Sequence, residues 1–374
     1  MQTIFNSKVK ETLYIEKLKN GLTVMIIPKK GIQKKYIIWG THYGSNDNKF
    51  VVPGENELIE VPKGVAHFLE HKMFEQENGK NSLDVLTSIG VNANAYTTND
   101  HTAYLYECTD NFYEALDEFM DYVQHPYFTD QNVEKEKGII GQEIKMYDDY
   151  PEWRVYLNAL EAMYYKNPVK LDITGTVETI SHIDKDVLYK CYNTFYNPSN
   201  MCLVVSGDFE PEKLLEEIKK RLLDTAQNGE IKRIFEDEPE RIVKQKIEQD
   251  MNVSKPIFTI GIKCKVPNQN EKVRIHIAME IILNMLIGES SNLYKEMYQT
   301  GNIFAMPNLS YEFGDNYAHI LITENANNPE ILFERLREEI ESFKKNGLNE
   351  EDFERTKKMI YGEYVKEYND ATSI

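Results

Sequence analysis

The sequence has few cysteines, and their spacing suggests no disulfides. Its 374 residues include four, Cys108, Cys191, Cys202 and Cys264, and no two of them have the C-x-x-C spacing. Disulfide frameworks belong mainly to small secreted domains. We therefore expect four free thiols rather than disulfides.

Long apolar runs and an excess of positive charge are absent as well. No stretch approaches the ~18–20 apolar residues that cross a bilayer, and the opening residues lack an apolar segment of the signal-peptide type. We therefore expect no membrane span and a cytoplasmic location. With 43 Lys and Arg against 61 Asp and Glu, the net charge of −18 does not provide the basic surface that nucleic-acid binding requires.

The composition is that of a globular protein, because hydrophobic residues make up 41% and charged residues 28%. A chain of this length usually forms two domains. Residues 225–252 are polar and dense in charge, which is typical of a connector. We expect a first domain over residues 1–224, a charged linker over 225–252 and a second domain over 253–374.

Apolar periodicity predicts both strands and helices, without regular β-α alternation, and so an α+β fold. The expected strands are 22–28, 36–45, two within 92–107, 201–207 and 257–267. The expected helices are 64–76, about 112–125, about 130–147, 211–223 and 273–288.

The first helix carries the H-x-x-E-H motif as His67-Phe68-Leu69-Glu70-His71, a signature of one class of zinc peptidases. Residues four apart lie on one face of a helix, so both imidazoles can bind one ion. Glu70 projects beside them and can accept a proton from a water molecule held there. The motif therefore predicts a catalytic zinc site.

A catalytic zinc needs a third protein ligand. Two candidates lie on the helix expected at about 130–147, where Glu136 and Glu143 are seven residues apart on one face. This spacing corresponds to ~10 Å along the helix axis. The sequence alone leaves open which of the two is the ligand, or whether both are surface residues.

Taken together, these segments resemble the pitrilysin, insulin-degrading and mitochondrial-processing-peptidase family of zinc peptidases. The resemblance covers almost the whole chain and includes HFLEH, NANAYTT, EKEKGIIGQEIKM, FYNPSNMCLVVSGD and SSNLYKEMY. It is strongest to the zinc-bearing subunit of bacterial peptidases that are built from two short chains. It implies a zinc-dependent endopeptidase that cleaves short or unfolded peptides and binds one zinc ion per chain.

The resemblance also assigns roles to residues. His67 and His71 match the zinc-binding histidines, and Glu70 matches the general base. Glu143 matches the third zinc ligand, and Glu136 matches the glutamate that supports the site.

Three further residues match the family's substrate-binding strand. Asn94, Ala95 and Tyr96 correspond to an edge strand that pairs with the peptide backbone. The implied fold is two homologous α+β domains that enclose a peptide chamber. Relatives continue beyond the helix that begins near Asn349, so the second domain is expected to be truncated.

The second domain departs from the family pattern at two positions. Relatives carry an arginine and, seven residues later, a tyrosine that hold the peptide carbonyl. Tyr298 and Ala305 stand in their places. This departure predicts a partner, namely a paralogous subunit that lacks H-x-x-E-H but supplies the arginine and tyrosine.

Two other functions compete with this interpretation. The chain could be a non-catalytic or regulatory subunit of a peptidase complex, although the intact HFLEH motif argues against this. It could also be a lyase that uses the same motif, as do the small S-ribosylhomocysteine-cleaving enzymes. Those enzymes are far shorter and also use a cysteine.

Overall fold

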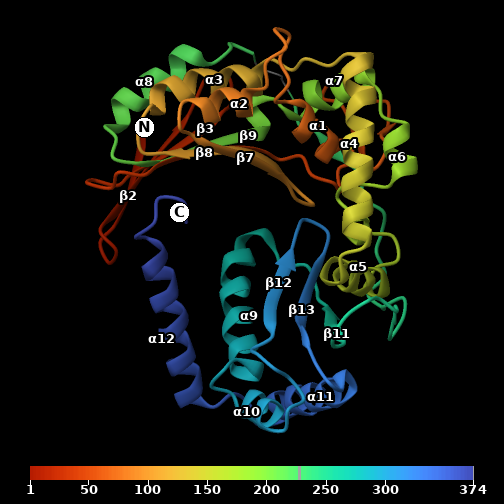
Figure 1. The fold of residues 1–374 in the computed structure, drawn as a ribbon. Coiled ribbons are helices and arrows are strands. Elements are labelled where there is room, and N and C mark those ends of the chain that lie inside the picture. The colour runs from red at the N-terminus through yellow and green to blue at the C-terminus, as the bar shows by residue number, and fades with distance from the viewer. Residues whose placement is uncertain (226–228, 374) are drawn as a thin grey trace. The chain divides into compact units, whose positions relative to one another are not determined.

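The computed structural model describes residues 1–225 and 229–373 (Figure 1). The strands are β1 Gln2–Asn6, β2 Glu11–Lys17, β3 Thr23–Pro28, β4 Lys35–Thr41, β5 Lys49–Val51, β6 Ile59–Glu60, β7 Asn92–Thr97, β8 Thr102–Cys108, β9 Met201–Gly207, β10 Lys232–Arg233, β11 Ile257–Lys263, β12 Asn308–Phe313 and β13 Ala318–Asn325. The α-helices are α1 Val65–Lys72, α2 Ser82–Ser88, α3 Phe112–Gln124, α4 Asp130–Asp148, α5 Pro151–Met163, α6 Val177–Ser181, α7 Lys185–Phe195, α8 Pro211–Arg221, α9 Lys272–Ile287, α10 Asn292–Gln299, α11 Pro329–Asn346 and α12 Glu350–Glu367. Short 3-10 turns cover Pro168–Lys170, Pro198–Asn200 and Gln269–Glu271. The predicted α+β class is confirmed.

The chain forms two compact units that are interleaved in sequence. The first unit contains Met1–Ile144, Asp172–Ile234 and the segment that begins at Glu367, and the second contains Lys145–Leu171 and Phe235–Lys366. The domain boundaries at 224 and 252 that the sequence suggests stay a prediction. Residues 226–228 of the expected linker and residue 374 of the expected second domain lie outside the described residues.

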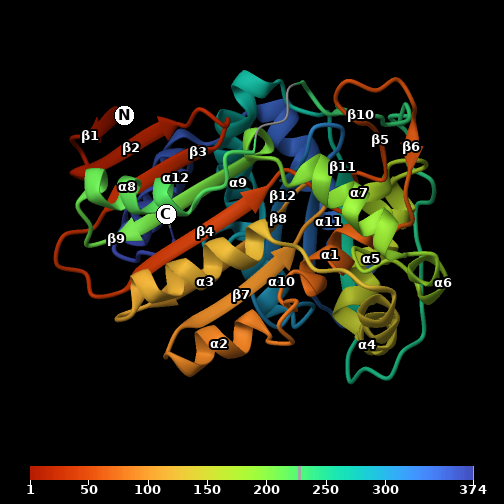
Figure 2. The ribbon, with the colours of Figure 1, turned by 90° about the horizontal axis from the view of Figure 1, so that it is seen from above.

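A seven-stranded sheet organises the first unit, in the order β1-β2-β3-β9-β4-β8-β7. The apolar strand β9 lies between β3, to which it is parallel, and β4, to which it is antiparallel. Helices α2, α3 and α8 cover one face of this sheet (Figures 1 and 2). Trp39 of β4, Tyr104 of β8 and Phe119 of α3 are fully buried between the sheet and these helices. At the outer end of the sheet, β8 is the one strand among the described residues that pairs with β7.

Two glycines set the boundaries of elements near this sheet. Helix α1 begins after Gly64, whose φ is +91° and whose missing side chain leaves room for the Thr174 carbonyl. The strand expected over 36–45 ends at Thr41 instead. Beyond that point the chain turns, and Gly44 lies so close to the backbone of Asn99 and Asp100 that no other residue fits there.

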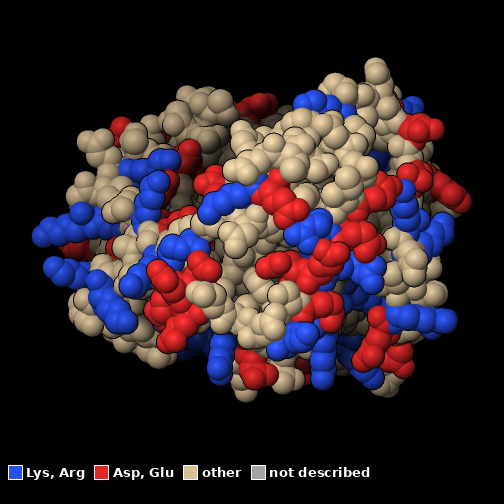
Figure 3. All heavy atoms as spheres, turned by 90° about the horizontal axis from the view of Figure 1, so that it is seen from below, with Lys and Arg blue, Asp and Glu red and all other residues tan. Residues whose placement is uncertain are grey.

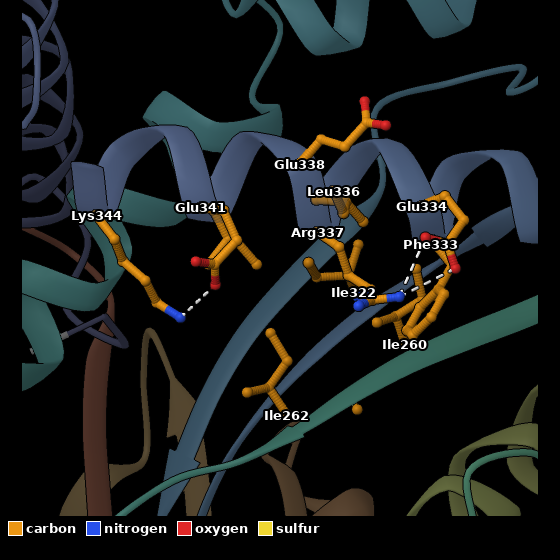
Figure 4. A pocket seen from close by; sticks show the side chains of 12 residues that line it. Ile260, Ile262, Ile322, Phe333, Glu334, Leu336, Arg337, Glu338, Glu341 and Lys344 are labelled. Carbon is orange, nitrogen blue, oxygen red and sulfur yellow. Dashed lines mark hydrogen bonds and ion pairs between the residues drawn. The ribbon is translucent and has the colours of Figure 1, made fainter. Parts of the chain in front are cut away.

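The second unit has an antiparallel three-stranded sheet in the order β11-β13-β12. Its core includes Leu286 of α9, Met297 of α10 and Leu336 of α11. An apolar groove lies between α11 and the strands β11 and β13, with Ile260, Ile262 and Ile322 below the helix (Figure 4). None of the residues that the sequence nominates for the zinc site lines this groove.

Charges of both signs are mixed on the surface of the second unit. On the face that contains α10 and α11, basic and acidic side chains lie next to one another (Figure 3). Along α11, Lys344 pairs with Glu341 at 2.7 Å and Arg337 pairs with Glu334 at 3.1 Å. Exposed pairs of this kind contribute little to stability.

The expected linker is anchored to the second unit by one carboxylate. Glu238 accepts hydrogen bonds from the backbone N–H groups of Tyr165, Lys166 and Asn167 at 2.7–2.9 Å and pairs with Lys263 at 2.5 Å. Burial opposes ionisation of Glu238, but Lys263 and the three amides outweigh it and lower its pKa from 4.5 to about 2. The segment around Glu238 is therefore part of the folded unit.

We expect Glu238→Gln to destabilise the second unit by about 2 kcal/mol at neutral pH, because hydrogen bonds to a charged group are the stronger ones. A lowered pKa means that this stabilisation is complete above pH 4.5 and declines as the pH falls towards about 2. Urea unfolding at pH ~7 and ~3 measures this, with the exposed Glu240→Gln as control. A difference from wild type that stays constant between these pH values would contradict the assignment.

Candidate functional site

His67 and His71 lie on one face of α1, as their spacing predicts. Their ring centroids are 4.5 Å apart and the ring planes are inclined by 55°. The helix is nearly all buried, and His67 is 8% exposed. Two imidazoles on adjacent turns are therefore held in contact.

Glu143 of α4 completes a cluster of three with these histidines. Its Oε1 lies 3.7 Å from Nε2 of His67, and its Oε2 lies 3.5 Å from Nε2 of His71. These distances exceed the 2.7–3.2 Å typical of N–H···O bonds. Donors around a tetrahedral zinc ion, with bonds of about 2.0–2.2 Å, are roughly 3.3–3.6 Å apart. The buried Glu143 Oε2 has no hydrogen-bond partner among the described residues, so the geometry fits donors that share an ion.

Glu136 has a different place in the arrangement. Its Oε1 lies 3.1 Å from Nδ1 of His71, on the side of the ring that faces away from Glu143. This is an ordinary hydrogen-bond distance. In metal sites a carboxylate at the second nitrogen fixes the tautomer of the ligating imidazole. Glu136 is therefore placed to support His71 rather than to join the cluster of three.

The protonation of these groups follows from burial and from their neighbours. Burial, reinforced by His71, lowers the pKa of His67 from 6.5 to about 3, so its imidazole is neutral at physiological pH. Burial opposes protonation of His71, but the Glu136 hydrogen bond and other nearby carboxylates outweigh it and raise its pKa. Burial also raises the pKa of Glu143, against the effect of His71. A neutral imidazole is the form that binds a metal.

Glu70 lies on the same helix and is held from the sheet. It is 8% exposed, and its Oε2 accepts a hydrogen bond of 2.7 Å from the hydroxyl group of Thr97 at the end of β7. Burial raises the pKa of Glu70, and the Thr97 hydrogen bond only partly offsets this. Thr97 was not among the residues that the sequence nominates, although it directly follows Asn94, Ala95 and Tyr96.

These three residues lie on β7 as expected. Asn94 is exposed, Tyr96 is 39% exposed, and the Tyr96 ring packs edge-on against His101. The N–H of Thr98 donates to the His101 carbonyl across the turn. Because hydrogen-bonded and non-hydrogen-bonded pairs alternate along an antiparallel ladder, the backbone groups of Ala93, Ala95 and Thr97 point away from β8, toward the free edge. The N–H of Ala95 donates to the side chain of Asn94 at 2.9 Å.

The two departures of the second domain lie in the second unit. Tyr298 is at the end of α10, where it is 53% exposed and stacks on Tyr294. Ala305 is exposed in the segment before β12. Among the described residues, no helix has the length and apolar character needed to cross a membrane.

Comparison with known proteins gives the family. A profile described as insulinase, peptidase family M16, matches residues 59–177, and one described as the peptidase M16 inactive domain matches residues 182–360. An uncharacterized zinc protease of Bacillus subtilis, YmfH, is 42% identical over 98% of this chain and 86% of its own length. The chain belongs to peptidase family M16.

Other proteins are similar to this chain in sequence or in fold. An uncharacterized zinc protease of Rickettsia felis is 25% identical over 94% of this chain and 83% of its own. A crystal structure described as that of an M16-like peptidase from Alicyclobacillus acidocaldarius has a TM-score of 0.93 at 33% identity, over 97% of this chain and 86% of that one. A Helicobacter pylori protease shares the fold, with a TM-score of 0.78 at 19% identity over 96% and 87% of the two chains.

The two M16 profiles divide the chain in a way that bears on the site. His67, Glu70, His71, Glu136 and Glu143 all lie within residues 59–177, the range of the insulinase profile. The profile described as inactive begins at residue 182. Its description therefore does not apply to the residues of the cluster.

The two glutamates of α4 should differ in their effect on metal affinity. We expect Glu143→Gln to weaken zinc binding most, because it removes an oxygen of the cluster. Glu136→Gln should cost about 10- to 100-fold, the usual effect of a group that supports a ligand. Chelator competition measures both, with Glu134→Gln on the exposed side of the same helix as control. The opposite ranking would make Glu136 the ligand.

Proposed function

We propose that this M16 chain is a zinc-dependent endopeptidase that hydrolyses short or unfolded peptides. The observation that supports it best is the cluster of His67, His71 and Glu143, whose donor atoms all lie within 4.8 Å of one another. Two imidazoles and one carboxylate are a ligand set of catalytic zinc sites. The relatives named zinc proteases support the same metal.

In this proposal each residue of the site has one task. His67, His71 and Glu143 hold the zinc, and Glu136 orients His71 through Nδ1. A zinc ion held by these three residues would supply Lewis acidity toward the peptide carbonyl and would lower the pKa of a nearby water to about 7. Glu70 accepts a proton from the attacking water at its carboxylate and passes it to the leaving amine.

The environment of Glu70 suits this proton transfer. Thr97 holds one oxygen of the carboxylate, so the other is left to exchange the proton. Burial shifts the pKa of Glu70 upward, toward neutral pH. A group that first accepts and then donates a proton works best when its pKa lies near the operating pH.

The substrate class follows from the free edge of β7. Asn94, Ala95 and Tyr96 belong to a strand with one unpaired side, and an extended peptide can add to such an edge by backbone hydrogen bonds. Folded proteins rarely offer an extended segment. Short or unfolded peptides are therefore the proposed substrates. The cytoplasmic location is a separate prediction.

The alternative is a non-catalytic or regulatory subunit of a peptidase complex. The description of the profile over residues 182–360 as inactive is compatible with it, although that profile does not cover the residues of the cluster. Zinc binding without any peptide cleavage, alone or with partners, would establish this alternative.

We expect the purified chain to bind about one zinc ion. His67→Ala should remove both metal and activity, because it removes a ligand. Glu70→Gln should keep the zinc while turnover falls by about 100- to 10,000-fold, the usual contribution of acid–base catalysis. Metal analysis and peptide cleavage measure this, with thermal melting in chelator as the folding control. Loss of zinc from Glu70→Gln equal to that from His67→Ala would refute the role of Glu70.

We also propose that the chain is the catalytic subunit of a two-chain complex. Tyr298 and Ala305 occupy the positions where family resemblance leads us to expect an arginine and a tyrosine. Without these donors a peptide carbonyl is poorly positioned and polarised, and each effect is worth several kcal/mol. A paralogous chain that lacks the H-x-x-E-H motif and carries the pair would supply the missing donors.

Adding this paralogue should raise kcat/KM for peptide cleavage on the order of 100-fold. The measurement compares the isolated chain with the reconstituted mixture, and a paralogue with its arginine changed to alanine is the control. Full turnover by this chain alone, unchanged by the paralogue, would refute the two-chain proposal. It would leave the zinc site unaffected.

A further inference from the structure

Lys72 is a buried lysine next to the candidate metal cluster. It is the last residue of α1, directly after His71, and is 0% exposed. An ammonium group removed from water is costly unless opposite charges compensate it. Its burial therefore calls for carboxylate partners.

Those partners connect Lys72 to the cluster. The ammonium contacts a carboxylate oxygen of Glu75 and lies 3.5 Å from Oε2 of Glu136. The other oxygen of Glu136, Oε1, holds Nδ1 of His71 at 3.1 Å. Lys72 and His71 thus lie at the two oxygens of one carboxylate.

This connection is specific to one of the two histidines. Nε2 of His71 faces Glu143, and its Nδ1 faces Glu136. The buried Nδ1 of His67 has no hydrogen-bond partner among the described residues. Among the described residues, the hydrogen bond that orients the His71 imidazole therefore comes from Glu136, and this bond orients only that ring.

We propose that Lys72 is a positioning residue of the metal centre and acts on His71 through Glu136. The ammonium attracts Oε2 as an ion pair at 3.5 Å, which leaves Oε1 toward Nδ1 of His71 and Nε2 of that ring toward the candidate cluster. It also balances the charge of a carboxylate that is 8% exposed. This inference rests on the proposed zinc site.

A structural role alone would give a different result. If Lys72 only neutralised a buried charge, its loss would lower the melting temperature of the metal-free protein and leave metal affinity unchanged. Metal affinity in a double-mutant cycle separates the two roles, because it tests whether Lys72 acts through Glu136.

The cycle comprises wild type, Lys72→Met, Glu136→Gln and the double variant. Zn²⁺ affinity is measured by chelator competition, and the absorption spectrum of bound Co²⁺ reports ligand geometry. We expect Lys72→Met to weaken zinc binding about 10-fold and to shift the Co²⁺ spectrum. In the Glu136→Gln background the same change should have little further effect.

Lys29 provides a matched control. It is 4% exposed, and its ammonium pairs with Glu11 at 2.5 Å and donates to the Tyr368 carbonyl at 2.6 Å. Lys29→Met removes a buried lysine of the same unit that shares no partner with the cluster. It should lower the melting temperature and leave zinc affinity unchanged.

Several results would overturn the proposal. Equal zinc affinity of wild type and Lys72→Met would do so, as would equal weakening by that change in both backgrounds. If Lys72→Met does not fold, the double variant can take its place, because it removes both buried charges. A difference in zinc affinity between the double variant and Glu136→Gln would then refute the route through Glu136. Wild type that binds neither ion would refute the zinc site itself, and the role of Lys72 with it.

Discussion

The first unit has to bury several charged or ionisable groups within a few ångströms of one another, and this constraint governs the candidate site. His67, Glu70 and Glu136 are each 8% exposed. Glu143 lies beside the two histidines, but no ordinary hydrogen bond joins it to either of them. Buried carboxylates without compensation are costly. Lys72 forms an ion pair with Glu136, and Thr97 donates a hydrogen bond to Glu70. Neither group contacts Glu143. Glu143 is half-buried, but its Oε2 is buried without a hydrogen-bond partner among the described residues, and a divalent cation at the cluster would compensate it.

The backbone around this site is arranged so that the side chains have little freedom. Gly64 allows α1 to start where the Thr174 carbonyl leaves no room for a side chain, and this start fixes the register of His67 and His71. Glu136 and Glu143 come from one helix, two turns apart, and reach opposite sides of the same imidazole ring. Since both belong to the one helix α4, the two carboxylates cannot shift independently.

The sequence predicts the parts of this arrangement that are local. The i, i+4 spacing is enough to place His67 and His71 on one face, with Glu70 beside them. The choice between Glu136 and Glu143 is not local, because it depends on which nitrogen of His71 each one faces. Thr97 was missed because no sequence rule pairs a strand residue with a glutamate 27 positions earlier. Lys72 offered a weak signal, since it interrupts an otherwise apolar helix face before the buried Met73 and Phe74. The inclusion of residues 145–171 in the second unit depends on tertiary packing that periodicity does not report.

Thr97 connects the two halves of the proposed mechanism. Its side chain holds Glu70, whereas its backbone groups lie at the free edge of β7. The hydroxyl of Thr102 lies 3.3 Å from that of Thr97 and donates its own proton to the Tyr43 carbonyl at 2.9 Å, so the proton of Thr97 is left for Glu70. A peptide that pairs with β7 would therefore contact the same residue that orients Glu70. Because a base must lie within hydrogen-bond reach of the proton that it takes, a shared anchor keeps substrate and base in register without a separate conformational step.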